Sequence, residues 1–247
     1  MTTNRRWAAL GAGVLIAVAG AVAAGGIPPS VRLAHKHGHA AQVTFLEGKA
    51  GRTESGAAVE TPIKQGDQLL EGDLVATEAK SRIELKLDDN SLLRLGPNAR
   101  IALTEAQFDG GAQTRKLSVK LFFGNIWAKV TSAVSADQRF AVETENAVAG
   151  VRGTTFRVDA HADKSVLVRV YAGAVAVARP VGQRTDEKGA RLEVAGPAEV
   201  SRDQWEKLVG AQMQISVSAK GVPGEPSPFT DEPADAWAKW NEERDAK

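Results

Sequence analysis

The chain has 247 residues, with 31 Lys and Arg against 30 Asp and Glu, a formal net charge of +1, and no cysteine. This balance provides no broad basic surface, so the sequence predicts no nucleic-acid partner. The lack of cysteine excludes disulfides, thiolate metal sites and a cysteine nucleophile. A content of 43% hydrophobic and 25% charged residues is typical of a globular protein of about one domain. Its core must be aliphatic, because aromatic residues make up only 5%.

The first 27 residues predict either a membrane anchor or an export signal. Arg5 and Arg6 precede an uncharged stretch from Trp7 to Gly26, whose 20 residues, at about 1.5 Å each, can span a hydrocarbon core of about 30 Å. The same pattern is typical of a secretory signal, with Ala21–Ala23 as a small-x-small cleavage site. Both interpretations place the folded part outside the cytoplasmic membrane. We expect a periplasmic protein, and we favour an uncleaved anchor with Met1–Arg6 inside.

Residues 28–42 predict a polar spacer. The spacer contains three alternating histidines, His35, His37 and His39. Neutral imidazole is a good ligand for Zn, Cu or Ni, but no carboxylate or fourth donor lies near these histidines in the sequence. We therefore expect a flexible linker, with no specific metal site and no cofactor.

From Val43 to Arg179 the sequence predicts a series of short strands. Ile83, Leu85 and Leu87 alternate with polar residues, as on a half-buried strand. The acidic turn at 88–91 leads into a second apolar run at 92–95, which predicts a hairpin. We favour a turn over a calcium loop because further oxygen ligands and a closing Glu are missing. The other expected strands are Leu117–Phe122, Ile126–Val130, Phe140–Glu143, Thr154–Asp159, Val166–Tyr171 and Ala174–Ala178.

Three similar segments indicate how these strands are connected. Phe45–Ala50, Phe122–Ile126 and Tyr171–Val175 each place a glycine between an apolar strand and a second strand. Their unequal spacing argues against a regular repeat, but successive rungs of a sheet that turn at glycine corners would produce this pattern. The sequence therefore predicts an all-β fold, either a short irregular solenoid or a sandwich.

The most distinctive run lies at 147–158. Two glycines three residues apart within a strand-like stretch indicate a turn or a close backbone approach. A phosphate-binding loop is excluded because no Gly-Lys-Ser/Thr leads into a helix. We expect Arg152 to be either buried with a charge partner or in contact with a ligand. The predicted structural motif consists of Gly150, Val151, Arg152, Gly153, Thr154 and Phe156.

This run resembles the signature of the FecR-type periplasmic domain family. Matching motifs lie around it, at Gly66–Asp67, Gly72–Thr77, Asp89–Leu95, Leu121–Ile126 and Val170–Val175. The resemblance covers about Val43 to Arg179. It implies a twisted, solenoid-like all-β unit outside the cytoplasmic membrane, and we assign residues 43–181 to this domain.

The best-known members of that family are anti-sigma regulators that relay the state of an outer-membrane transporter to a sigma factor. Those regulators carry a cytoplasmic anti-sigma domain before the membrane span, whereas only Met1–Arg6 could occupy that position here. The chain therefore resembles a solitary FecR domain. We do not carry the sigma-factor role over from the resemblance.

Residues 182–247 predict a C-terminal extension with helical parts. Ser201 to Gln204 has the spacing of a capping box, which predicts a short helix through Val209. The Pro-rich stretch at 221–228 predicts an extended linker, and a second helix is expected to reach Asp245. Trp237 and Trp240 lie three residues apart, on one face of this helix. They either dock on the β domain, which we favour, or bind a partner.

The sequence offers no recognisable catalytic constellation. His161 lies in a polar turn, and no glycine-flanked nucleophile is present. We therefore expect a non-catalytic envelope module for interaction or signalling that binds a protein or cell-wall component, with Arg152, Trp237 and Trp240 as candidate partner-binding residues. The alternatives are an envelope scaffold, or a signalling subunit that regulates a sigma factor only through a separate transmembrane partner.

Overall fold

The computed structural model describes residues 39–109, 114–131, 138–151, 153–180, 206–230 and 235–246. The expected anchor or signal at 1–27 and most of the expected spacer lie outside these residues. Within the described ranges no helix combines the length and apolar character that a membrane crossing requires.

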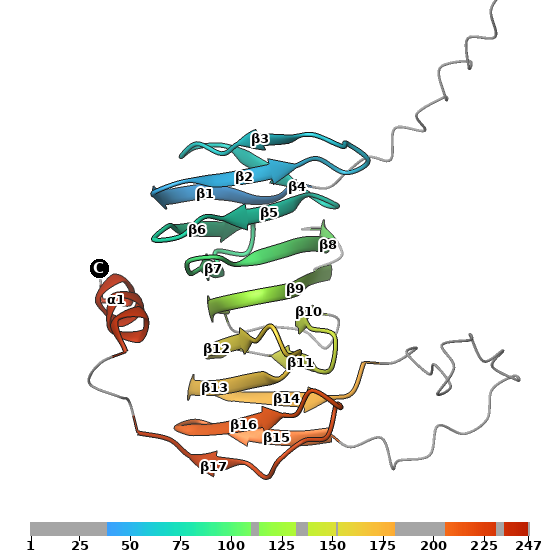
Figure 1. The fold of residues 1–247 in the computed structure, drawn as a ribbon, viewed down its shortest axis with the longest axis vertical. Helices are drawn as coiled ribbons and strands as arrows, with labels where there is room; N and C mark the ends of the chain where they lie inside the picture. The colour runs from blue at the N-terminus through green and yellow to red at the C-terminus, as the bar shows by residue number, and fades with distance from the viewer. Residues whose placement is uncertain are drawn as a thin grey trace, which may run out of the picture. The chain divides into compact units, whose positions relative to one another are not determined.

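The described residues form seventeen strands and one helix (Figure 1). The first nine strands are β1 (His39–Glu47), β2 (Ala50–Thr53), β3 (Glu60–Pro62), β4 (Gln68–Leu70), β5 (Leu74–Thr77), β6 (Arg82–Leu87), β7 (Leu92–Leu95), β8 (Arg100–Asp109) and β9 (Thr114–Lys129). The remaining elements are β10 (Gln138–Glu143), β11 (Val148–Val151), β12 (Thr155–Ala160), β13 (Val166–Ala172), β14 (Ala174–Ala178), β15 (Glu206–Gly210), β16 (Met213–Val217), β17 (Ser227–Pro228) and α1 (Ala236–Asp245).

The strands form two layers, which we call sheet A and sheet B. Sheet A has the order β4-β1-β6-β7-β9-β12-β13-β16-β17. Sheet B has the order β3-β2-β5-β8-β9-β10-β11-β14-β15. All of these pairings are antiparallel except the parallel pair β9 and β10. The long strand β9 belongs to both layers, and the stacked rungs are visible in Figure 1.

The core lies between the two layers. Ile83, Leu85 and Leu93 of sheet A belong to the same buried cluster as Val75 and Ile101 of sheet B, and all five side chains are 0% exposed. Period-two alternation sends every second side chain of a strand inward, so each layer buries one apolar face against the other. The cluster is almost entirely aliphatic, as the composition predicted.

Glycine corners carry the chain from one layer to the other. Gly48, Gly124 and Gly173, the glycines of the three similar segments, all have positive φ, at 77°, 91° and 84°. At Gly124 there is also no room for a side chain, because a Cβ would lie 2.4 Å from the Cα of Ala99. The predicted glycine corners are therefore confirmed, and they explain how a single chain builds both layers.

Most expected strands are confirmed, including the hairpin of β6 and β7, whose register pairs Ile83 with Leu95. The strands expected at Leu117–Phe122 and Ile126–Val130 form one continuous strand, β9, which passes through Gly124. The fold is mostly β with one short helix near the C-terminus.

The expected helix from Ser201 to Val209 is wrong for its described part. Glu206–Gly210 is strand β15, which pairs antiparallel with β14. The capping-box pattern is a local signal, whereas the pairing buries Val209 completely in the main core. Tertiary burial outweighs local helix propensity here.

The linker at 221–228 is extended, as predicted, but it does not leave the β unit. Ser227 and Pro228 pair with β16, and Pro223 forms an isolated bridge with Val217. Phe229 follows directly and packs edge-on against Tyr171, with ring centroids 5.3 Å apart. These contacts hold residues 223–229 against sheet A.

The two motif glycines differ in what they do. Gly153 has a φ of 60°, in the left-handed region that favours glycine. At Gly150 the structure contradicts the expected close packing, because a Cβ would meet only the Ala176 carbonyl oxygen, at an ordinary 3.9 Å. Gly150 lies in β11, paired with Ala141 and Ala176, so its environment is a regular sheet.

The corners provide a test of the fold. We expect Gly124→Ala to lower the free energy of unfolding by about 2 kcal/mol or more, because the methyl group adds a backbone clash to the cost of about 1 kcal/mol for a positive φ. Gly66→Ala is the matched control, since Gly66 has a φ of 95° and open space around it. Chemical denaturation measures both. Equal losses would show that backbone crowding at Gly124 is unimportant.

Candidate functional site

A row of large polar and aromatic side chains crosses the outer face of sheet A. The residues stand directly opposite one another on neighbouring strands, about 4.8 Å apart. The row runs Glu84, Arg94, Trp127, Arg157, Arg169, Gln214. We call these six residues the cross-strand row. They point away from the aliphatic core because their strand neighbours point into it.

Helix α1 covers part of this row. Its ten residues span about 15 Å, comparable to the width of three to four strands. The N-cap residue Asp235 accepts hydrogen bonds from the backbone N–H groups of Trp237 (3.1 Å) and Ala238 (2.9 Å). Trp237, Ala238 and Asn241 are the buried residues of the helix.

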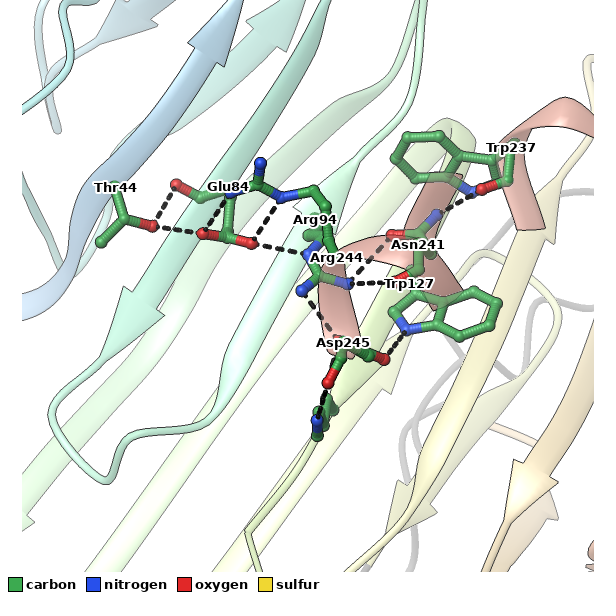
Figure 2. A network of polar contacts seen from close by, with 9 residues as sticks. Thr44, Glu84, Arg94, Trp127, Trp237, Asn241, Arg244 and Asp245 are labelled. Atoms are coloured by element: carbon green, nitrogen blue, oxygen red, sulfur yellow. Dashed lines mark hydrogen bonds and ion pairs between the residues drawn. The ribbon is translucent and has the colours of Figure 1, made fainter. Parts of the chain in front are cut away.

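Arg94 is at the centre of the polar contacts under α1. Its side chain is 1% exposed, and its Nε donates to Glu84 Oε2 at 2.7 Å. Its Nη2 lies 2.8 Å from Asp245 Oδ1, and its Nη1 donates to the backbone oxygen of Asn241 at 3.2 Å and to the Asn241 side chain at 3.3 Å. Figure 2 shows that these partners come from both the sheet and the helix. The buried guanidinium therefore joins α1 to sheet A.

Glu84 is the second residue of this network. Arg244 donates to both carboxylate oxygens at 3.1 Å, and the Thr44 hydroxyl donates to Oε1 at 2.8 Å. Burial alone would raise the pKa of Glu84, but the hydrogen bonds from Arg244, Arg94 and Thr44 outweigh it and lower the pKa to about 2. Glu84 is therefore ionised at neutral pH and holds two guanidinium groups.

Aromatic rings surround the polar contacts. Trp127 is 1% exposed, lies 4.3 Å from Tyr171 between ring centroids, and donates from its indole nitrogen to Asp245 Oδ2 at 3.2 Å. Trp237 and Trp240 stack with centroids 5.2 Å apart and an interplanar angle of 14°. Trp127, Trp237 and Ala238 form a second small apolar cluster outside the main core.

Cations lie over the Trp240 ring. The guanidinium carbons of Arg82 and Arg244 lie 5.1 and 5.2 Å from the ring centroid, and that of Arg94 lies 5.9 Å away. Arg244 also lies 4.1 Å from the centroid of Phe45. Cation–π contacts of this kind add to the ion pairs that hold this end of α1.

A second group of charges holds the N-terminal end of the helix. Arg157 pairs with Asp159 at 2.7 Å and with the N-cap residue Asp235, and Arg169 lies 3.6 Å from Asp235. Burial opposes the ionisation of Asp235, but the Ala238 backbone N–H and the two arginines lower its pKa overall. Both ends of α1 are thus attached to the cross-strand row by charged groups.

The structure answers the question about the two C-terminal tryptophans. Trp237 is 8% exposed and Trp240 is half-buried, and both lie against the chain's own sheet A. The favoured prediction of docking is therefore confirmed. Their expected role in binding a partner is a separate prediction, which this contact leaves open.

The other predicted motif residues lie within the β unit. Val151 is in β11, Phe156 is in β12 and is 0% exposed, and Thr154 is buried between these strands. Phe156 packs edge-on against Phe140 at 6.2 Å. Arg152 lies outside the described residues, so its two expected roles stay predictions.

The spacer histidine that the structure describes belongs to a strand. His39 begins β1, and its Nδ1 lies 2.6 Å from Asp88 Oδ1. Across the described part of the chain, no group of three or more His, Cys, Asp or Glu is placed to hold a metal ion.

Sequence reasoning missed most of the residues under α1. It placed Glu84 on a solvent-facing strand surface, and it did not single out Arg94, Trp127, Asn241 or Arg244. One signal was present, since an acidic and a basic residue face each other across the predicted hairpin of β6 and β7. Their burial depends on a helix about 150 residues further along the chain, and no local pattern reports that contact.

Part of the chain matches the model of a known protein family. Residues 73–176 match the family model described as FecR protein. The match runs from just before β5 to the middle of β14, and it confirms the predicted resemblance to the FecR family over this segment. A comparison with curated proteins finds no match.

Two crystal structures, at 1.65 and 2.50 Å resolution, are similar to the chain in part. Both are of a candidate anti-sigma factor from Parabacteroides distasonis ATCC 8503, with 18% sequence identity and a TM-score of 0.45. The matches cover 68% of this chain and 64% and 63% of the two solved chains. This chain thus spans somewhat less than two thirds of the length of the protein that it matches.

The low pKa of Glu84 predicts how stability changes with pH. A carboxylate with a lowered pKa stabilises the fold above its unfolded value of about 4.5, and this contribution is lost as the pH falls toward 2. We expect Glu84→Gln to cost about 3 kcal/mol at pH 7, the scale for breaking a buried ion pair, and the gap from the wild type to narrow below pH 4.5. Thermal melts at several pH values measure both effects.

Glu78→Gln is the control for this experiment, because Glu78 is an exposed carboxylate. This variant should follow the wild type closely at every pH. A constant gap between Glu84→Gln and the wild type from pH 7 to pH 3 would contradict the assigned role of the Glu84 charge.

Proposed function

We propose that the protein is a non-catalytic signalling module of the cell envelope that binds a protein partner on the periplasmic side of the cytoplasmic membrane. The match of residues 73–176 to the FecR family supports a regulatory role over a catalytic one. The proposed location rests on the apolar stretch from Trp7 to Gly26, which would anchor the chain in the membrane.

One observation carries the proposal for partner binding, namely the composition of the outer face of sheet A. Trp, Tyr and Arg dominate the energy of protein–protein interfaces because they combine large apolar area with directional polar groups. Trp127, Tyr171, Arg94 and Arg157 gather these types on one face. That face already holds a helix of the same chain, so its shape and charges suit the binding of a protein segment.

A cell-wall component and a self-associating scaffold are the other occupants that the sequence leaves open. Carbohydrate recognition would require aromatic rings with a free face for a sugar to stack on. On the outer face of sheet A, Trp127 is buried and Trp240 is partly buried, with arginines over its ring, whereas the exposed rings of Phe122 and Phe123 lie next to the Gly124 corner. We therefore favour a protein partner.

The proposed location leads to a test in cells. We expect the full chain to pellet with membranes, and externally added protease to digest it in spheroplasts but not in intact cells. Sequencing of the mature N-terminus then distinguishes an anchor that begins at Met1 from a cleaved product that begins near Ala24. Protection from protease in spheroplasts would contradict a periplasmic location.

Partner binding leads to a second test. A photo-cross-linking amino acid at Lys86, which is exposed on β6 two residues from Glu84, should capture one discrete protein in cells. The same probe at Arg100, which is exposed on β8 of sheet B, is the matched control and should not capture it. Equal capture at both positions would contradict a role for sheet A. Capture only of further copies of the chain would favour the scaffold.

A further inference from the structure

Helix α1 depends on sheet A for its structure. It has only ten residues, and isolated helices shorter than about 12 to 15 residues are marginal in water. Its buried residues are limited to Trp237, Ala238 and Asn241, and the remaining contacts are polar or half-exposed. The helix therefore behaves as a small ligand that folds on a surface already built by the sheet.

The charges of the helix match those of the sheet at both ends. Asp235 meets Arg157 and Arg169, while Asp245 meets Arg94. The charges are reversed at a third contact, where Arg244 of the helix pairs with Glu84, the acidic residue of the row. The acidic residue lies at one end of the cross-strand row and the arginines follow it, so the row favours a helix with one polarity and one order of charges.

The sheet keeps its own ion pairs if the helix leaves. Arg94 remains bonded to Glu84 at 2.7 Å, and Arg157 remains bonded to Asp159 at 2.7 Å. Each arginine therefore keeps one carboxylate partner when α1 departs. An arginine left without a carboxylate would make departure of the helix energetically costly. Departure removes the apolar cover of Trp127 and the ion pairs made by Asp235, Arg244 and Asp245, and another helix with equivalent groups could replace them.

The chain's own helix is an imperfect fit to this surface. The indole nitrogen of Trp237 is buried and has no hydrogen-bond partner among the described atoms. A buried donor without an acceptor weakens binding, because its bond to water is lost and not replaced. A helix with phenylalanine at this position would avoid that loss.

We propose that the outer face of sheet A binds a helix of a partner protein, and that this helix carries aromatic residues and a carboxylate near each end. In this proposal the partner helix displaces α1, which competes with it for the same surface. The inference rests on the proposed function and specifies the partner. The partner helix has the same pattern of side chains as α1. It carries a carboxylate two residues before its first aromatic residue and a second aromatic residue three positions after it. A cation follows seven positions after the first aromatic residue, and a second carboxylate follows eight positions after it.

Fluorescein-labelled synthetic peptides of residues 233–247 stand in for the partner helix in a binding assay with the full chain. Wild type should bind weakly because α1 competes. The double variant Asp235→Ala/Trp237→Ala, which we call the weakened-helix variant, weakens docking of the chain's own helix without altering sheet A. It should bind the peptide at least tenfold more tightly than the wild type does. The control Lys239→Ala/Glu243→Ala changes two exposed positions of α1 and should bind like the wild type.

Two further measurements test the chemistry of recognition. A peptide with Trp237→Phe should bind at least as tightly as the unmodified peptide. In a double-mutant cycle within the weakened-helix variant, Arg244→Gln in the peptide should weaken binding about tenfold when Glu84 is present. It should weaken binding less than twofold when the chain carries Glu84→Gln. Circular dichroism verifies that each chain retains its β fold.

Several outcomes would overturn the proposal. The first is equal affinity of the peptide for the wild type and the weakened-helix variant. The second is that the weakened-helix variant is folded but does not bind the peptide. The third is that light scattering shows a wild-type dimer in which the two copies exchange α1, because the occupant of the surface would then be a second copy of the chain. Because the assay uses purified protein, its failure is separate from that of the proposed function. Peptide binding without any cross-linked protein in cells would contradict the function alone.

Discussion

Arg94 holds its guanidinium out of water, 1% exposed, between Glu84 on the neighbouring strand and Asp245 on α1. An arginine cannot lose its proton at accessible pH, so burial requires carboxylates and hydrogen-bond acceptors on every side. Glu84, Asp245 and Asn241 provide them. The position of the C-terminal helix, the burial of Trp127 and the low pKa of Glu84 all depend on this arrangement.

The two-layer fold makes this arrangement possible. Glycine corners carry the chain between layers, so that strands distant in sequence become neighbours in sheet A. The register then places Glu84, Arg94, Trp127 and Arg157 opposite one another on β6, β7, β9 and β12. Each of these residues belongs to a different strand, and their alignment is a property of the sheet. The aliphatic core behind the row provides the stability that allows its outer face to be specialised.

The polar character of the contact between α1 and sheet A has a functional consequence. The charge pairs between α1 and sheet A can be exchanged for equivalent pairs from another helix, and they require that helix to carry the same order of charges. The sheet retains the pairs Glu84–Arg94 and Arg157–Asp159 in either case. In the proposed function, this face combines a rigid scaffold with a cover that a partner can replace, as a regulated interaction requires.

Local patterns in the sequence determined most β elements between Val43 and Arg179, the hairpin at 83–95, the glycine corners and the final helix. They could do so because alternation, turn residues and positive-φ glycines act over a few residues. The same patterns failed at Glu206–Gly210, where pairing with β14 outweighs a capping-box signal. They also failed at Gly150, which has space around it. Only the tertiary structure decided that Glu84 and Arg94 are buried, because the helix that covers them lies about 150 residues away and burial is set by contacts between distant segments.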